Sequence, residues 1–220
     1  MNPSNTGLRA LAPLAPLFTL LALAPSCVAN AAGGDPSSEG VATLTQSDSL
    51  SGSCYMLDWH GGTGGDMTMG LGCGGNGVAV GIWGSTTQRR YTDPYDFIQS
   101  FGLICETFDA KGHLQPPWTD LTGGPNGSFG YHLLCPAGEV MVGLGGNSGT
   151  YVDYVGPICQ PLARIRDPNE TGRHWWPGAG GYGGNPFQDP CLAGYAITGG
   201  VVHSGGFVDS VQLECIFIAP

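Results

Sequence analysis

Six cysteines at repeated spacings divide most of this chain into three similar units. They form three successive pairs, separated by 32, 24 and 24 residues: Cys73 and Cys105, Cys135 and Cys159, Cys191 and Cys215. The longer first unit carries eight additional residues around positions 86–93. A repeat of this length indicates one supersecondary unit copied several times. The three units therefore predict one domain built from three equivalent parts.

Each unit contains two short stretches with the pattern of β-strands. The first follows the first cysteine and reads CGGNGVAVGI, CPAGEVMVGL or CLAGYAITGG, with a glycine eight residues after the cysteine: Gly81, Gly143 and Gly199. The second precedes the second cysteine and is introduced by a turn, SGTYVD or SGGFVD in the last two units. Alternating residues bounded by glycine clusters are typical of β-strands. We predict an all-β domain, with a closed threefold arrangement that protects the sheet edges.

Glycine occupies 39 of the 220 positions, whereas charged residues make up only 11%. Glycine suits tight turns and close backbone contacts, and each one inside a helix costs about 1 kcal/mol relative to alanine. The formal net charge is −10, with seven lysines and arginines in total. This balance argues against binding to nucleic acid and against a polybasic membrane contact. We therefore expect a binding partner that carries no net charge.

The first 31 residues have the pattern of a signal peptide. An apolar run over 10–24 is too short to span a bilayer, and small residues precede position 32. Residues 32–53 read as a flexible linker. The predicted domain covers 54–220, with units at about 54–105, 118–159 and 176–215. We expect a secreted or extracellular protein; the alternative is a lipid anchor at Cys27, which would leave the protein attached to the cell surface.

In an exported protein, cysteines at repeated spacings indicate disulfides rather than metal ligands. Fifteen pairings of six cysteines are formally open, and the repetition favours the pairs within each unit. Each such bond contributes roughly 3 kcal/mol in the chain-entropy model. Cys54 lies outside the repeat. It is a free thiol, a bridge to a second chain, or the partner of Cys27.

The sequence carries no catalytic motif. A Gly-x-Ser-x-Gly elbow, a His-Glu-x-x-His helix and a Cys-x-x-Cys pair are all absent. The histidines lack ligand spacing: His60, His113, His132, His174 and His203. We therefore predict no enzymatic activity, no cofactor and no metal. The sequence is compatible with a monomer and with an oligomer.

The HGGTGG loop at 60–65 and the SGTYVD and SGGFVD turns resemble the jacalin-related lectins, especially the threefold, griffithsin-like members. This resemblance covers about residues 55–217. It implies a β-prism I fold, with three four-stranded antiparallel sheets and pseudo-threefold symmetry. It also implies binding of neutral glycans of the mannose or glucose type. One cysteine pair per unit resembles vitelline membrane outer layer protein I, and implies the alternative of a coat protein that binds no sugar.

The lectin resemblance implies two sites, each between the aspartate turn of one unit and the glycine loop that follows in the ring. The first combines Gly149, Tyr151 and Asp153 with Gly180, Gly181, Gly183 and Gly184. The second combines Gly205, Phe207 and Asp209 with Gly61, Gly62, Gly64 and Gly65. An ionised aspartate accepts strong hydrogen bonds from sugar hydroxyls, glycines expose backbone N–H groups, and an aromatic ring covers the apolar face of a sugar.

The third turn and its loop depart from this pattern. Gln99 stands where the other units have aspartate, and the loop at 123–127 reads GGPNG, in which proline lacks an N–H donor. We therefore expect two working sites per chain. In the alternative interpretation, Asp153 and Asp209 bond nearby turn amides and the loops are plain turns. Trp59, Trp118 and Trp176 are expected to pack between sheets, with Trp175 more exposed.

Overall fold

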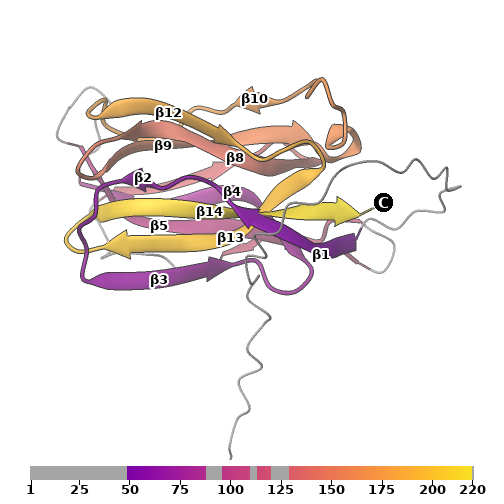
Figure 1. The fold of residues 1–220 in the computed structure, drawn as a ribbon, viewed down its shortest axis with the longest axis horizontal. Helices are drawn as coiled ribbons and strands as arrows, with labels where there is room; N and C mark the ends of the chain where they lie inside the picture. Colours follow the sequence, from indigo (N-terminus) through magenta and orange to yellow (C-terminus); the bar gives the residue numbers. More distant parts are fainter. Residues whose placement is uncertain (1–48, 88–95, 110–112, 120–128, 220) are drawn as a thin grey trace, which may run out of the picture.

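The computed structural model describes residues 49–87, 96–109, 113–119 and 129–219 (Figure 1). The predicted signal peptide, Cys27 and the GGPNG loop lie outside these residues. Within them the chain forms fourteen strands and one 3₁₀ helix, η1 (Leu162–Arg164). None of the helices in these ranges is long and apolar enough to cross a membrane.

The strands form three antiparallel sheets, each with a path of four strands. Sheet 1 has the order β6 (Trp118–Thr119), β5 (Ile98–Thr107), β4 (Gly77–Thr86), β7 (Phe129–Leu134). Sheet 2 has the order β10 (His174–Trp175), β9 (Val152–Pro161), β8 (Glu139–Ser148), β12 (Asn185–Pro190), and β11 (Ala179–Gly180) also pairs with β9. Sheet 3 has the order β1 (Ser49–Met56), β14 (Val208–Ala219), β13 (Tyr195–Ser204), β3 (Met67–Gly72), and β2 (His60–Gly61) also pairs with β14.

Each sheet combines a central hairpin from one unit with edge strands from the next unit. The hairpin β4–β5 receives β6 and β7, and the hairpin β8–β9 receives β10 and β12. The hairpin β13–β14 receives β1 and β3 from the start of the domain, seen as indigo and purple strands beside yellow ones in Figure 1. The all-β, three-sheet prediction is confirmed. Strand β1 begins at Ser49, so residues 49–53, predicted as linker, belong to sheet 3.

The recurring glycine of each unit follows a β-bulge in the central hairpin. The register shifts between Ala79 and Gly81, and the equivalent shifts precede Gly143 and Gly199. A β-carbon at Gly143 would lie 2.5 Å from the backbone oxygen of Asp189 on β12, and one at Gly199 would lie 2.8 Å from that of Leu71 on β3. The glycine is thus needed because an edge strand passes directly over it.

The bulge also holds the end of the edge strand. In each sheet the carbonyl of the extra residue accepts the N–H of a cysteine, at 2.7–2.8 Å: Val80 from Cys135, Val142 from Cys191, Thr198 from Cys73. A bulge leaves one residue without its ladder partner, and the cysteine amide satisfies that carbonyl here. The three bulges therefore place three cysteines at equivalent positions.

The three predicted disulfides are confirmed: Cys73–Cys105, Cys135–Cys159 and Cys191–Cys215. Each first cysteine follows an edge strand of one sheet and each second cysteine lies on a central strand of another. The bonds consequently join sheet 3 to sheet 1, sheet 1 to sheet 2, and sheet 2 to sheet 3. Cys54 is also disulfide-bonded, which excludes the free thiol; its partner lies outside the described residues.

The disulfides lie within the largest cluster of buried apolar side chains. This cluster draws on the central strands of all three sheets, with Phe101, Leu144, Val155, Ile197 and Leu213 among its members. Each such side chain contributes roughly 1.5–3 kcal/mol on burial. The core is therefore shared by the sheets, and the neighbouring residue on each strand faces away from it.

The tryptophans differ from the prediction. Trp59, Trp118 and Trp176 are 39–45% exposed, so they do not pack between sheets. They are also not equivalent in register, because Trp118 pairs with Cys105, whereas His174 pairs with Cys159 and Tyr55 with Cys215. Their similar positions before each first cysteine come from loops of different length.

We predict that Gly143→Ala destabilises the domain, because its methyl group would meet the backbone of β12. The expected loss is about 1–3 kcal/mol in the free energy of unfolding, the usual cost of overpacking. Gly70→Ala on strand β3 is the matched control, since a β-carbon there meets nothing within 4 Å. Urea unfolding curves measure both. Equal stability of the two variants would contradict the role assigned to the bulge.

Candidate functional site

Each central hairpin turns at the same end of the molecule, on the left in Figure 1 for β8–β9 and β13–β14. A second register shift lies beside each turn. It leaves Asp153 between the pairs of Val152 and Tyr154, and it leaves Asp209 in the same position of its own hairpin. Gln99 occupies the corresponding position in sheet 1. Each of these three residues lies six positions before the second cysteine of its unit. They are structural equivalents, and only two of them are acidic.

The two glycine loops lie against the two aspartate turns. The N–H of Gly181 donates to the backbone oxygen of Asp153 at 2.8 Å, and that of Gly62 donates to the backbone oxygen of Asp209 at 2.8 Å. The loops share one conformation, with φ of 105° and 122° at their first glycines and 69° and 87° at their last: Gly180 and Gly61, Gly184 and Gly65. Positive φ at these positions requires glycine. The contact between turn and loop that the sequence predicts is present twice.

The loop backbone also approaches the carboxylates. A β-carbon at Gly184 would lie 2.6 Å from Oδ2 of Asp153, and one at Gly65 would lie 2.9 Å from Oδ2 of Asp209. A β-carbon at Gly64 would overlap Oδ1 of Asp209. The glycines of the turns lie farther from the carboxylates: a β-carbon at Gly205 would be 3.6 Å from Oδ2 of Asp209. The sites therefore consist of a carboxylate lined by backbone.

Neither carboxylate has a partner in the part of the chain that the structure describes. Asp153 is 5% exposed and Asp209 is 6% exposed, and neither makes a side-chain hydrogen bond or ion pair with a described residue. Burial raises the pKa of Asp153 to about 6, because desolvation disfavours its charged form. The alternative that these aspartates bond turn amides is therefore not supported. A buried carboxylate without donors favours a ligand that brings them.

The aromatic residues of the turns do not stand free beside the carboxylates. Tyr151, Phe207 and Phe97 form a triangle with ring centroids 5.3–5.5 Å apart. They are equivalent residues, each eight positions before the second cysteine of its unit, so their mutual contact places them at the pseudo-threefold axis. Each ring packs against the other two, and the role of Tyr151 and Phe207 in covering a sugar stays a prediction. The sequence did not single out Phe97, because its turn lacks the glycines.

Each loop lies between two turns. The N–H of Gly181 also donates to the backbone oxygen of Asp96 at 2.9 Å, and a β-carbon at Gly62 would meet the backbone oxygen of Thr150. Asp96 is itself held by the hydroxyl of Thr87 at 2.9 Å. Each loop is thus held between the turn of its own sheet and a turn of a neighbouring sheet, so the sites are preformed.

The middle of the first-site loop carries an exposed aromatic residue. Tyr182 is 54% exposed, and Thr63 takes its place in the other loop. Tyr182 was not among the predicted site residues, although an aromatic residue amid four glycines is a signal that the sequence offers. Tyr182 is the exposed ring closest in sequence to the glycines that line Asp153.

The histidines near the second site have structural partners. Nε2 of His60 lies 3.0 Å from Oδ2 of Asp189, and its ring stacks on Phe187 with centroids 3.7 Å apart. This contact joins sheet 3 to sheet 2. The His203 ring lies beside Trp59, with centroids 4.8 Å apart. The described residues contain no group of three or more His, Cys, Asp or Glu side chains that could hold a metal ion.

No protein-family profile and no curated protein matches this sequence. Solved structures are similar to it at low identity. A single-chain recombinant jacalin matches with a TM-score of 0.50 and 14% identity, over 75% of this chain and 95% of that chain. Malaysian banana lectin matches at 0.48 and 16%, over 75% and 99%, and Calystegia sepium agglutinin at 0.49 and 17%, over 75% and 97%. At such identities the likeness establishes the fold alone: the chain adopts the jacalin-like β-prism I fold.

Proposed function

We propose that this protein is an exported lectin that binds neutral hexose glycans of the mannose or glucose type. One observation carries the proposal: two nearly buried carboxylates, Asp153 and Asp209, have no partner among the described residues and face glycine loops of the same conformation. A jacalin-like fold supports it. Export is part of the proposal and rests on the sequence alone.

The chemistry of the sites suits a sugar. A carboxylate accepts hydrogen bonds from two adjacent hydroxyls, and such charge-assisted bonds are stronger than neutral ones. The loop glycines leave no side chain between the backbone and a ligand, so a ring can approach closely. An anionic ligand would meet the aspartate charge in a chain of net charge −10. The ligand is therefore neutral and rich in hydroxyls, and no step of catalysis is proposed.

The two sites act together on a glycan-coated surface. Gln99 supplies no charge at the third position, so we propose two sites per chain. A millimolar site contributes only about −4 kcal/mol, whereas two linked sites can exceed either alone by ~10² to 10⁴ when the geometry permits. Useful affinity then depends on simultaneous binding.

We predict that Asp153→Asn and Asp209→Asn each weaken binding at their own site. The change keeps the shape of the side chain and removes its charge, which should cost roughly 1.5–3 kcal/mol. Isothermal titration with methyl α-mannopyranoside measures the affinity and the stoichiometry. We expect two equivalents for the parent protein and one for each single variant. Gln99→Ala is the matched control and should leave both values unchanged.

Two outcomes would favour the coat-protein alternative instead. The first is binding that survives the double variant Asp153→Asn/Asp209→Asn unchanged. The second is no binding to any neutral hexose on a glycan array. In either case the aspartate turns would be scaffolding, and the three disulfides that join the sheets would serve a structural protein.

Binding at the first site should depend on pH. Since the pKa of Asp153 is raised to about 6, the carboxyl group is largely protonated at pH 5 and ionised at pH 7. We expect the affinity of this site to rise over that interval and then level off. The Asp209→Asn variant isolates the site for titration, and adding Asp153→Asn should abolish the rise. An affinity that is constant from pH 5 to 7 would contradict the assigned role.

The same pKa shift affects the stability of the ligand-free protein. The pKa of an aspartate is about 3.9 in the unfolded chain, so the folded state holds the proton more tightly. The contribution of Asp153 to stability is therefore lost as pH rises from about 4 to 6. Thermal unfolding should show that Asp153→Asn removes this part of the pH dependence.

A further inference from the structure

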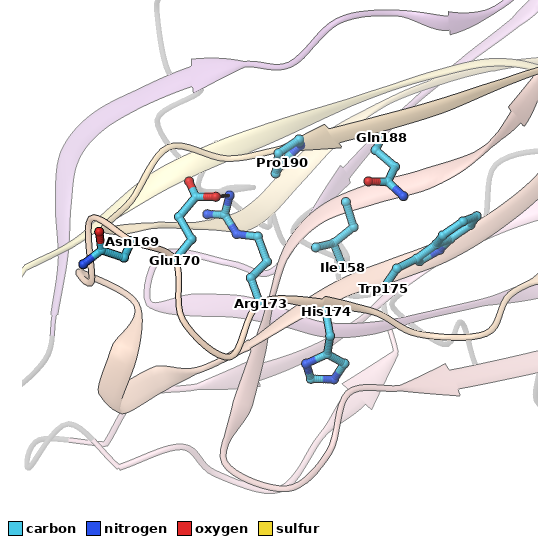
Figure 2. A pocket seen from close by; sticks show the side chains of 8 residues that line it. All are labelled: Ile158, Asn169, Glu170, Arg173, His174, Trp175, Gln188 and Pro190. Atoms are coloured by element: carbon cyan, nitrogen blue, oxygen red, sulfur yellow. Dashed lines mark ion pairs between the residues drawn. The ribbon is translucent and has the colours of Figure 1, made fainter.

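A hollow of about 370 Å³ lies on sheet 2, away from the aspartate turns. Its lining residues come from β9, β10, β12 and the loop before β10: Ile158, Asn169, Glu170, Arg173, His174, Trp175, Gln188 and Pro190. Figure 2 shows the Glu170–Arg173 pair, Ile158, Gln188 and Trp175 around it, with the His174 ring directed away. None of these residues belongs to the sites above. The volume falls within the range of about 300–1,000 Å³ that is usual for ligand sites.

Two glycines form the floor beside this hollow. Leu144 and Val155 point into the core, so their neighbours Gly145 and Gly156, which pair directly across β8 and β9, face the other way. The Trp175 side chain lies over both. A β-carbon would be 3.1 Å from the indole at Gly145 and 2.6 Å from its Nε1 at Gly156. The missing side chains therefore let the indole lie close against the sheet.

Side chains fill the same place in the other two sheets. The pair equivalent to Gly145 and Gly156 is Trp83 and Gly102 in sheet 1, and Val201 and Gln212 in sheet 3. Only sheet 2 thus combines two glycines here with a tryptophan supplied by the edge strand, among the residues described. The hollow is a feature of one sheet and does not follow from the threefold repeat.

The indole is held in place and remains accessible. Trp175 is 43% exposed. Its ring meets that of Tyr154 edge to face, with centroids 6.1 Å apart. Its N–H makes no hydrogen bond to any described residue. A fixed, partly exposed aromatic ring with a free donor can bury the apolar face of a ligand and bond its polar edge.

Polar groups border the indole, and their charges cancel. The Arg173 guanidinium lies 2.5 Å from Glu170 and donates to the backbone oxygen of Cys191 at 3.0 Å. Glu170 has a φ of 52°, in a loop closed by a bond from the N–H of Arg173 to its backbone oxygen at 3.0 Å. Gln188 is exposed on β12, opposite Gly145. The border therefore offers donors and acceptors without net charge.

We propose that this hollow is a second kind of glycan site, which binds one neutral pyranose ring. The apolar face of the ring stacks on Trp175, and its hydroxyls bond the amide of Gln188 and the carboxylate of Glu170. A flat apolar face edged by hydroxyls is the ligand chemistry that an aromatic platform with an uncharged polar border fits. The inference extends the proposed function to another surface and does not depend on the aspartate turns.

The test uses the full chain carrying Asp153→Asn and Asp209→Asn, so that the turn sites are disabled. The protein is titrated with the methyl pyranosides of mannose, glucose, galactose and N-acetylglucosamine, and the indole Nε1–H signals are followed by NMR. We expect a saturable shift of the Trp175 signal with at least one sugar. Gln188→Ala should raise the dissociation constant, and Trp175→Ala should raise it about tenfold or more, as monitored through backbone amides of β9 and β12. Trp118→Ala, an equally exposed tryptophan on sheet 1, is the control.

The outcomes separate this site from the turns. If the aspartate turns no longer bind sugar and the Trp175 signal still shifts, the result supports a sugar site in the hollow that is independent of the turns. Absence of a Trp175 shift with all four sugars overturns the proposal, whatever the turns do. A sugar response that survives both Trp175→Ala and Gln188→Ala also overturns it. So does a change in oligomeric state on Trp175→Ala, measured by analytical ultracentrifugation, because the face would then contact a second copy of the chain.

Discussion

The sheets depend on edge strands that each unit gives to the preceding hairpin. Such an edge strand can dock only where the hairpin has no side chain, and Gly143 and Gly199 provide that space against the backbone of β12 and β3. The bulge beside each glycine then fixes a cysteine amide, and the disulfide that follows ties the sheet to its neighbour. Because the last hairpin takes its edge strands from the start of the domain, the ring of three sheets closes, and each sheet is complete only where two units meet.

The same exchange of strands builds the candidate sites. A glycine loop arrives with the edge strands of one unit and lies over the turn of another, where Gly181 and Gly62 bond the backbone of Asp153 and Asp209. The loop backbone excludes side chains and leaves the carboxylates nearly buried, with no donor from the part of the chain that the structure describes. The fold thus maintains two desolvated acceptors that a hydroxyl-rich ligand would satisfy, and their energetic cost is the physical reason to expect one.

Local pattern was enough to predict part of this structure. Cysteine spacing predicted the three disulfides, and counting back from each cysteine identified Gln99 as the equivalent of the two aspartates. Contacts that depend on ring closure were not visible in the sequence. The triangle of Phe97, Tyr151 and Phe207 forms only when three units meet at the axis. The floor under Trp175 likewise requires the register that sets Gly145 opposite Gly156, which no single segment encodes. The prediction that Trp59, Trp118 and Trp176 pack between sheets was wrong, because exposed positions can differ in register from one unit to the next while buried positions cannot.

The central claim is that the carboxylates of Asp153 and Asp209 hold a sugar against the glycine loops. A crystal structure of the protein soaked with a mannose disaccharide tests it most directly. The account predicts a hexose whose adjacent hydroxyls lie within hydrogen-bond distance of Asp153, with loop 180–184 on its other side. It predicts a second hexose at Asp209 and loop 61–65, and none at Gln99. Sugar bound elsewhere while both carboxylates stay unoccupied would contradict it.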